Sequence, residues 1–374
     1  ALTITGNAGD YYELAGTGWT YTGVAGGYSV YTNGAQTLKV QSDMIRVQST
    51  SGGTLTNEQA TDYLKGGANN DTFALKDLTT DNKSTGADFG KIVGGGGNDA
   101  LTIAAGAAND NLAVDLTALG AGKISGITVI NLAAHGANHL TLDAATLSDM
   151  GATTLTVNGE AADSYELLGA SWTYVSTSGG YHQYTDAGGK TLKVQQAMVR
   201  VQNAAATGST LTSDVATDKL MGGAGDDIFA IKDVSNDGKI SGADFGLING
   251  GAGSNTLTFA AAANGLNIDL TALSAGKISN VSTIDLTGHG NNRLVLDNAT
   301  IANMGLTTLT VNGEAGDSYE LTGSGWVYSN TAGGYHIYTN GTQNLHVQDT
   351  LARVQQTPAA GGTLTGELTT DQLL

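Results

Sequence analysis

Short runs of alternating apolar and polar residues, separated by glycine-rich turns, recur along the chain. Mid-chain examples are Ser164–Leu167, Trp172–Val175, Tyr181–Tyr184 and Thr191–Val194. Period-two alternation over so few residues predicts half-buried β-strands. Asn33-Gly34 and Asn340-Gly341 predict hairpin turns, whose central positions need a positive φ. We therefore expect antiparallel β-structure here, closed in the middle copy by a short helix over 212–220 with Thr or Ser as its cap.

A second kind of stretch carries brief β-prone runs at wider separations. These runs are Thr256–Phe259, Asn267–Leu270, Ser282–Leu286 and Arg293–Leu296. Separations of roughly 10–16 residues suit the coils of a parallel solenoid better than long hairpins. Asp143–Gly151 and Asp297–Gly305 each predict a short helix that begins at an aspartate cap and ends at glycine.

The two kinds of stretch alternate in tandem repeats of about 154 residues, marked by Trp19, Trp172 and Trp326. The sequence thus predicts an all-β fold, in which parallel β-solenoid or β-roll-like segments alternate with small antiparallel β-sheet modules. Antiparallel modules are expected at 1–64, 155–220 and 309–374, and glycine-rich solenoid modules at 65–154 and 221–308. Because both ends interrupt a repeat, we expect a segment cut from a longer stalk or fibre and not a self-contained enzyme.

Composition narrows the class of protein further. The chain is 40% hydrophobic, which disfavours disorder, and its 55 glycines do not recur every third residue as in collagen. It has no cysteine, so disulfides and thiolate metal sites are excluded. A net charge of −18 disfavours nucleic acid as a partner and suits hard cations. No apolar run is long enough for a membrane helix, and no signal peptide stands at the N-terminus.

Four glycine-rich turns match the calcium-binding nonapeptide G-G-x-G-x-D-x-U-x, where U is a large apolar residue. The turns that begin at Gly94 and Gly222 match fully. Those that begin at Gly66 and Gly250 match in part, with Asn69 and Asn255 as departures. Glycines allow a tight turn with inward carbonyls, and the aspartate adds charged oxygen. Candidate ligands are Asp227, Asp226, Gly223, Gly225, Asp99, Gly95, Gly97, Asp71 and Asn255; the alternative is that glycine-rich turns arise by composition alone.

A second candidate lies between the paired nonapeptides. Residues 233–244 place oxygen-bearing side chains at EF-hand loop positions 1, 3, 5, 9 and 12, with glycine at 6. The candidate ligands are Asp233, Ser235, Asp237, Lys239 and Asp244 in this copy, and Asp77, Asp81 and Asp88 in the earlier one. The flanks have strand character, so this would be a calcium loop without the helix pair, or else a polar surface turn.

The motifs resemble the RTX (repeats-in-toxin) calcium-binding family of type I-secreted bacterial proteins. The segments 244–251, 284–296 and 309–317 look like parts of very large RTX adhesins and biofilm-associated surface proteins. The resemblance implies secretion as an unfolded chain, folding on external calcium, and a β-roll whose aspartates sandwich the ions. Two departures matter: the nonapeptides stand 28 residues apart instead of in unbroken tandem, and Asn255 lacks the carboxylate. Isolated sites are therefore expected in place of a long calcium ladder.

Other chemistry finds little support. His135 and His139 have a zinc-like spacing, but Arg293 replaces the second in the next repeat. No nucleophile elbow, Walker loop or H-E-x-x-H motif occurs, so we expect no enzyme, although an RTX-type hydrolase is a weaker alternative. Trp19, Trp172 and Trp326 with nearby tyrosines could stack on sugar rings, or form the core of a small sheet.

The sequence therefore predicts a calcium-stabilised structural repeat of a secreted bacterial adhesin, fibre or surface-layer protein. The expected location is the cell surface, and calcium ions are the expected cofactor. Self-association into fibres or a layer is a further expected partnership. The alternative is a polysaccharide-binding adhesin module that uses the Trp- and Tyr-bearing units.

Overall fold

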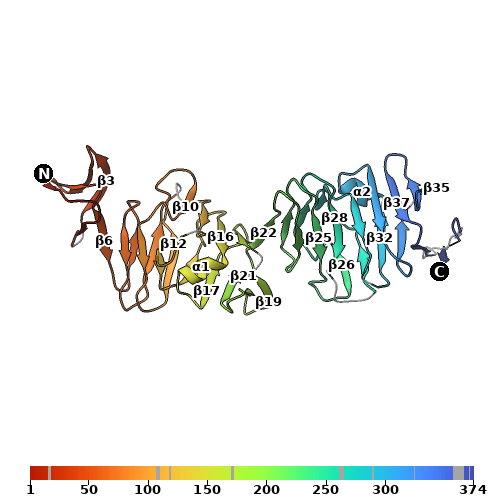
Figure 1. Ribbon diagram of the computed structural model, residues 1–374, viewed down its shortest axis with the longest axis horizontal. Helices are drawn as coiled ribbons and strands as arrows, with labels where there is room; N and C mark the ends of the chain where they lie inside the picture. The colour runs from red at the N-terminus through yellow and green to blue at the C-terminus, as the bar shows by residue number, and fades with distance from the viewer. Residues whose placement is uncertain are drawn as a thin grey trace. The chain divides into compact units, whose positions relative to one another are not determined.

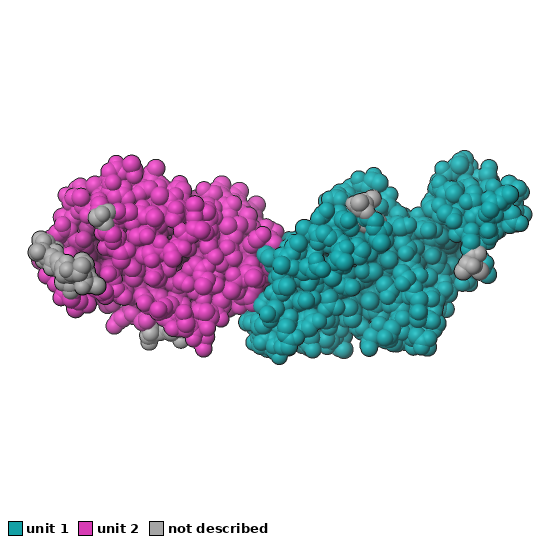
Figure 2. Space-filling view, turned by 180° about the vertical axis from the view of Figure 1, so that it is seen from behind, with its two compact units in different colours: residues 1–199 teal, residues 200–374 magenta. Residues whose placement is uncertain are grey.

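The structure is a computed structural model, and it describes residues 1–15, 18–106, 110–117, 119–169, 172–260, 265–288, 290–323, 325–356, 366–369 and 371–374. Regular structure within these residues is nearly all β, and most strands pair in parallel (Figure 1). The prediction of an all-β solenoid is confirmed. The chain divides into two compact units, residues 1–199 and 200–374 (Figure 2). No helix among the described residues is long and apolar enough to cross a membrane.

Unit 1 is built from parallel sheets that form the faces of a solenoid, plus an N-terminal hairpin sheet. The hairpin sheet has the order β1 (Leu2–Ile4), β5 (Gln36–Gln41), β4 (Tyr28–Asn33), β3 (Thr20–Ala25). One face has the order β2 (Tyr11–Glu13), β6 (Ile45–Ser49), β8 (Tyr63–Lys65), β11 (Lys91–Val93), β14 (Ile124–Ser125). A second face contains β7 (Thr54–Thr56), β9 (Thr72–Leu75), β12 (Asp99–Ile103), β15 (Ile127–Asn131), β17 (Thr154–Asn158), β21 (Thr191–Gln195), β20 (Tyr181–Thr185) and β19 (Thr173–Ser178). The third contains β10 (Lys83–Thr85), β13 (Ala113–Asp115), β16 (His139–Asp143) and β18 (Ser164–Leu168).

Unit 2 repeats these three faces. The first contains β22 (Val199–Asn203), β24 (Lys219–Met221), β27 (Leu247–Asn249) and β30 (Ile278–Ser279). The second contains β23 (Thr210–Thr212), β25 (Ile228–Ile231), β28 (Thr256–Phe259), β31 (Thr283–Asp285), β33 (Thr308–Asn312), β37 (Asn344–Gln348), β36 (Tyr335–Thr339) and β35 (Val327–Ala332). The third contains β26 (Lys239–Ser241), β29 (Asn267–Asp269), β32 (Arg293–Asp297), β34 (Ser318–Thr322), β38 (Ala352–Gln355) and β39 (Gln372–Leu373).

Each unit begins its solenoid with a short coil and continues with longer ones. In unit 1, Thr54 pairs with Thr72, 18 residues later, whereas Thr72 pairs with Ala100, 28 residues later. Unit 2 repeats both steps. The longer coil contains a third strand, β10 or β26, which lies within the loop between the paired nonapeptides. The 28-residue spacing of the nonapeptides is therefore one coil of the solenoid, lengthened by that loop.

Each repeat also carries an antiparallel excursion of three strands. In the middle copy, β19 pairs antiparallel with β20, and β20 pairs antiparallel with β21. β21 then pairs in parallel with β17. The hairpin predicted at Asn33-Gly34 forms, but Asn33 belongs to β4 and pairs with Gln36. Only the glycine of that dipeptide has a positive φ, of 58°. The division into five modules stays a prediction.

Two of the three predicted helices form. α1 (Ala144–Asp149) and α2 (Asn298–Asn303) begin at Asp143 and Asp297, and each cap accepts a hydrogen bond from the third helical residue. The helix predicted over 212–220 is wrong. Asp218 there accepts hydrogen bonds from the backbone N–H groups of Asp214 and Val215, at 2.7 and 3.2 Å, which closes a turn before β24.

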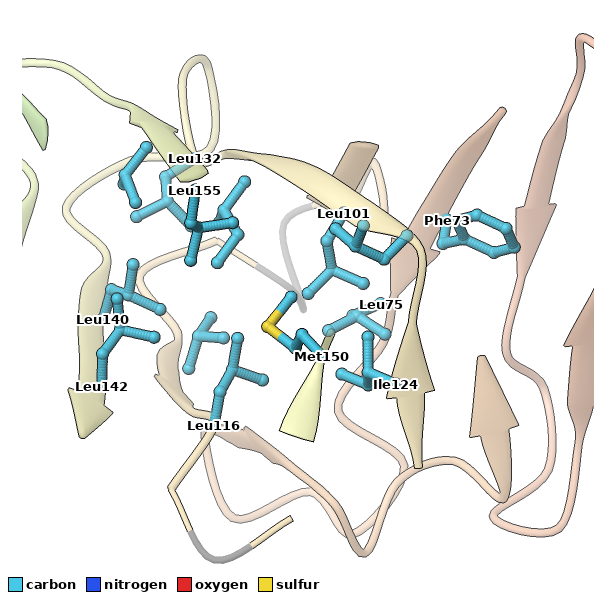
Figure 3. Packing of buried hydrophobic residues seen from close by; sticks show 14 of the residues in the cluster. Phe73, Leu75, Leu101, Leu116, Ile124, Leu132, Leu140, Leu142, Met150 and Leu155 are labelled. Carbon is cyan, nitrogen blue, oxygen red and sulfur yellow. The ribbon is translucent and has the colours of Figure 1, made fainter. Parts of the chain in front are cut away.

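The core of unit 1 is a column of aliphatic side chains directed inward from successive coils (Figure 3). Phe73 and Leu101 occupy matching positions of adjacent strands and are buried. Met150, just after α1, lies among leucines of neighbouring coils. The same positions form a separate core in unit 2. Since U of each nonapeptide enters this column, packing fixes the register of each glycine-rich turn.

Candidate metal centre

The glycine-rich turns form corners where successive coils stack closely. A Cβ on Gly66 would overlap the carbonyl oxygen of Gly94, and a Cβ on Gly94 would overlap that of Gly126. The first glycines of the unit 2 nonapeptides, Gly222 and Gly250, have the same relation to the next coil. The first motif position must therefore be glycine for steric reasons, whatever the turn binds.

In the first corner of each unit, the aspartate of the motif closes its own turn. Asp71 is buried and accepts hydrogen bonds from the backbone N–H groups of Gly67, Gly52 and Gly53, at 2.8, 2.5 and 3.2 Å. Burial acts to raise the pKa of Asp71, but these three N–H donors outweigh it and lower the pKa. Asp227 is its counterpart in unit 2, and it too accepts from its own turn and from the previous coil, at 2.9 and 2.8 Å.

In the second corner of each unit, the second glycine of the motif has a different backbone conformation from its counterpart in the first corner. Gly95 and Gly251 have φ values of +92° and +71°, whereas Gly67 and Gly223 do not have positive φ. In unit 2 the carbonyl groups of this turn then face the side chain at the sixth motif position, which is Asn255.

Asn255 satisfies this environment completely. Its Oδ1 accepts from the backbone N–H of Asp227 at 2.9 Å. Its Nδ2 donates to the carbonyl oxygens of Asn280 and Ala252, at 2.9 and 3.2 Å, with Gly253 further away at 3.5 Å. The primary amide therefore matches one donor on one side and a group of acceptors on the other.

Asp99 occupies the equivalent position in unit 1 and is not satisfied. Its Oδ1 accepts from the backbone N–H of Asp71 at 2.8 Å, but its Oδ2 is buried and has no hydrogen-bond partner among the described residues. The carbonyls that correspond to the partners of Asn255 belong to Gly96, Gly97 and Gly126. A Cβ on Gly94 would overlap both Asp99 Oδ2 and the Gly126 oxygen, so these two oxygens border the same point.

Electrostatics at Asp99 follow from this geometry. Burial raises the pKa of Asp99, the nearby charge of Asp71 adds to the rise, and the hydrogen bond from Asp71 N–H opposes it. Asp218 also has one buried oxygen, Oδ1, without a hydrogen bond, but its other oxygen, Oδ2, lies 3.7 Å from the guanidinium of Arg200. Asp99 makes no ion pair with any described residue. Asp99 therefore combines a buried carboxylate oxygen that has no hydrogen bond with the lack of any ion pair among the described residues.

The remaining predicted ligands of the nonapeptides lie at the same corners. Asp226 is exposed, and it accepts a hydrogen bond from the backbone N–H of Ser254 in the next coil at 2.7 Å. Gly97 has a φ of +104°, and a Cβ on Gly225 would overlap the backbone of Gly208. These glycines thus permit close stacking of the coils, and only their carbonyls are available as ligands.

The EF-hand-like loops bring positions 1, 3 and 5 together. The hydroxyl of Thr79 lies 3.2 Å from Asp77 Oδ1 and 3.0 Å from Asp81 Oδ1. In unit 2, Ser235 donates to Asp233 at 3.1 Å, and Asp237 accepts from the backbone N–H of Lys239 at 2.9 Å. The strand character predicted for the flanks is confirmed by β9 and β11 in unit 1 and by β25 and β27 in unit 2.

The aspartates at position 12 of these loops have a different role. Asp88 is buried, with Oδ1 accepting from the N–H of Leu78 at 2.9 Å and Oδ2 from that of Thr85 at 2.8 Å. Asp244 is bound in the same way. Both oxygens hold the loop closed from inside, whereas an EF-hand uses them as a bidentate ligand. No group of three or more His, Cys, Asp or Glu side chains suited to a metal occurs within the described ranges. The predicted ligand sets stay predictions.

Sequence reasoning missed a second family of corner aspartates. Asp62 and Asp218, and likewise Asp163 and Asp317, are buried and accept backbone N–H groups three or four residues earlier. Each precedes by two residues a buried apolar side chain, as in the nonapeptide. The pattern of an aspartate two residues before a core position would have found them without any glycine requirement.

The three tryptophans pack against the cores, each half-buried. The indole nitrogens of Trp172 and Trp326 are buried without a hydrogen-bond partner. Trp19 lines a cavity of about 480 Å³ together with Glu13, Arg46 and Glu58. Arg46 in turn binds both oxygens of Asp62.

No family model matches the chain, and no curated protein matches it. Among solved structures, the chain is similar to the extracellular lipase LipA of Serratia marcescens, at 13% identity and a TM-score of 0.17. The match covers 82% of this chain and 37% of the lipase, so the chain spans little more than a third of that protein's length. The resemblance to calcium-binding adhesins stays a prediction.

This comparison contradicts one expectation from the sequence. We expected no enzyme, yet the similar protein is a lipase, and the assignment as a non-enzyme is therefore withdrawn. A TM-score of 0.17 transfers no activity, substrate or catalytic residue to this chain.

Proposed function

We propose that the chain is a calcium-stabilised repeat segment of a secreted bacterial cell-surface protein, such as an adhesin, a fibre or a surface layer. It would fold on extracellular calcium. The observation that carries the proposal is the buried Oδ2 of Asp99, which borders the same point as the carbonyl oxygen of Gly126 and has no hydrogen-bond partner among the described residues.

A buried carboxylate oxygen needs a donor or a cation, because desolvation otherwise costs several kcal/mol. The groups around Asp99 Oδ2 are acceptors, to judge by the three carbonyls that Asn255 binds in unit 2. A proton or a metal ion would serve. Calcium takes carboxylate and carbonyl oxygens together, so the donor set of Asp99 with the carbonyls of Gly96, Gly97 and Gly126 fits this ion.

Calcium at this corner would stabilise the solenoid in two ways. It would neutralise the charge of Asp99, and it would tie the glycine-rich turn of one coil to Gly126 of the next. The chain carries a net charge of −18, so each bound ion also reduces self-repulsion. Since the ligands come together only in the folded chain, the binding free energy contributes to folding.

The EF-hand-like loops are a second class of candidate ligand. In unit 1, Asp77, Thr79 and Asp81 already point toward one another on the surface. The position 12 aspartates are occupied by backbone N–H groups, so these loops would bind calcium with fewer carboxylates than an EF-hand. We assign them a weaker affinity than the Asp99 corner.

A calcium titration of the metal-stripped chain tests the proposal. We expect β-structure by circular dichroism to increase, and the radius of gyration to fall, at micromolar to millimolar calcium. Magnesium at equal concentration is the ionic control, because its small octahedral shell suits this donor set poorly. A chain that is equally compact in calcium and in chelator would contradict the proposal.

Saccharide binding by the tryptophan-bearing units is a second candidate function. Only Trp19 supports it, because this residue lines a cavity with the polar groups of Glu13 and Glu58. Loss of glycan-array binding on Trp19→Ala, with an unchanged circular dichroism spectrum, would support this candidate. Equal binding by the variant would remove it.

A further inference from the structure

A shallow groove lies on the outer face of the sheet β2-β6-β8-β11-β14 in unit 1. It has a volume of about 300 Å³, and Tyr11, Ile45, Tyr63 and Lys91 contribute to its lining. These side chains point outward, because their neighbours along the strands, such as Leu64 and Ile92, are fully buried. No acidic side chain lines the groove.

Strand register places the aromatic and basic groups side by side. Tyr11 pairs with Ile45, and Tyr63 pairs with Lys91 on the next strand. The ring of Tyr63 carries the Lys91 ammonium 5.4 Å from its centroid, and Tyr11 is 63% exposed. The groove therefore presents two tyrosines beside one amine.

Positive charge continues along this face. β11 pairs with β14 so that Lys91 and Lys123 follow one another across the strands, and Lys65 lies two residues beyond Tyr63. None of these lysines forms an ion pair within the part of the chain that the structure describes. A strip of lysines without carboxylate partners, two of which lie over aromatic rings, is a local reversal of sign on a chain with a net charge of −18.

The repeats show that this chemistry is not needed by the scaffold. At the matching positions of unit 2, Lys219 stands for Tyr63 and Leu247 for Lys91, and these two residues pair in the same register. Ser164 stands for Tyr11 in the next repeat. Parallel strands thus pair in the same way where Tyr11, Tyr63 and Lys91 are replaced. The combination of Tyr11, Tyr63 and Lys91 is therefore not repeated at the matching positions Ser164, Lys219 and Leu247.

We propose that this groove binds an acidic saccharide, with a uronic-acid ring as its unit. The apolar C–H face of the ring lies against Tyr11, and the ring carboxylate pairs with Lys91, whose ammonium lies over the ring of Tyr63. A volume of about 300 Å³ is at the lower end for small-ligand sites and matches a short segment of a saccharide. Lys123 would meet the carboxylate of a following ring. This inference goes beyond the calcium proposal and does not depend on it.

Nucleic acid fits the face less well. Its affinity grows with the number of neutralised phosphates, and the strip offers few lysines within a strongly negative field. A saccharide needs one charge contact per ring and gains from aromatic stacking. The test below separates the two ligands.

Isothermal titration of the full chain at fixed calcium tests the inference. The probe is a β-1,4-linked tetrasaccharide of glucuronic acid, and cellotetraose is the neutral control with the same backbone. We expect a Kd of about 0.1–1 mM for the acidic probe and at least tenfold weaker binding of cellotetraose.

Variants that carry the residues of the other repeats are matched controls for folding. Tyr11→Ser and Lys91→Leu should each weaken the acidic probe about tenfold, since each removes one stacking or charge contact. Trp19→Ala should leave its affinity unchanged, which separates this groove from the tryptophan cavity. Equal binding of both tetrasaccharides, loss on Trp19→Ala in place of Lys91→Leu, or preference for a thymidine oligonucleotide would overturn the inference.

Discussion

The second glycine-rich corner of unit 1 and that of unit 2 share a positive φ at the second glycine and differ at the sixth motif position, which is Asp99 in one and Asn255 in the other. Gly95 and Gly251 both have positive φ, and in both corners the sixth motif residue accepts the N–H of the aspartate one coil earlier. Asn255 then donates to carbonyls, whereas Asp99 presents a second oxygen without a partner.

The two corners differ in how their buried carbonyl oxygens are satisfied. Carbonyl oxygens that converge on a buried point need positive charge or a donor. In unit 2 the amide of Asn255 supplies the donor from within the chain. In unit 1 the carboxylate of Asp99 makes the need larger, so the donor or cation must come from solution. Of the two second corners, the one that matches the motif fully is the one in which a carboxylate oxygen has no hydrogen-bond partner.

Asn255→Asp should have the largest effect on this comparison. It replaces the amide by a carboxylate that faces three carbonyls, and an uncompensated buried charge costs about 3–5 kcal/mol. We expect calcium-free unit 2 to lose that much stability and to recover most of it in calcium. Hydrogen exchange of the peptide over residues 250–259, measured in urea, reports unit 2 within the whole chain.

Ala275→Asp is the control for Asn255→Asp. It adds the same charge at an exposed turn of the same unit, where surface charges change stability by under about 1 kcal/mol. If Asn255→Asp is no more damaging than this control, or if calcium fails to rescue it, the carbonyls do not form a cation site and the comparison breaks.

Asp99→Asn is the reciprocal change and should be stabilising without calcium. The new amide would donate to the carbonyls of Gly96, Gly97 and Gly126, as Asn255 does to their counterparts. Removing an unsatisfied buried group is worth about 1–3 kcal/mol. The urea midpoint of calcium-free unit 1 should rise, and its response to calcium should shrink. If the variant keeps the full calcium response, the ion binds at another site, such as the loop at Asp77.

Much of the fold could be predicted because the repeat and the core pattern are local. The strands over 256–259 and 293–297, and the capped helices, follow from alternation and from an aspartate before a short apolar run. The turn at 213–218 was mistaken for a helix because the same capping chemistry also closes a coil corner. Asp218 could not be recognised as the closing residue without knowing that a strand follows it inside a stacked coil.

The sequence pattern located the glycine-rich corners, but it did not indicate which of their aspartates lacks a hydrogen-bond partner. Asp71 and Asp99 both lie at stacked corners, and the nonapeptide motif treats both as ligands. Asp71 is saturated by three N–H groups and Asp99 is not. The two corners also differ in the sign of φ at the second glycine and in the donors of the preceding coil, Gly52 and Gly53 for Asp71, and a sequence records neither. Asn255 looked like a weakened ligand for the same reason, although it completes its corner.

The pH dependence of calcium-free unit 1 should give the smallest effect. The pKa of Asp99 is raised by burial, so its folded form binds a proton more readily than the unfolded chain does. This contribution to stability is fully present below the ordinary aspartate value of 3.8 and is lost as pH rises through the raised folded value. Asp71 has a lowered pKa and acts in the opposite sense, but only below 3.8.

Acidification from neutral pH toward about 4 should therefore increase the urea midpoint of calcium-free unit 1 relative to Asp99→Asn, in buffers freed of metal by a chelating resin. Saturating calcium should abolish the difference, because a bound ion holds the carboxylate ionised. The difference between the urea midpoints of the wild-type chain and of Asp99→Asn isolates Asp99, because the other carboxylates titrate in both chains. Parallel pH profiles for the two chains would mean that Asp99 Oδ2 is satisfied in solution by something other than a proton or an ion. A buried water molecule that donates to the carboxylate would be that partner, and the corner of unit 1 would then be as complete as that of unit 2.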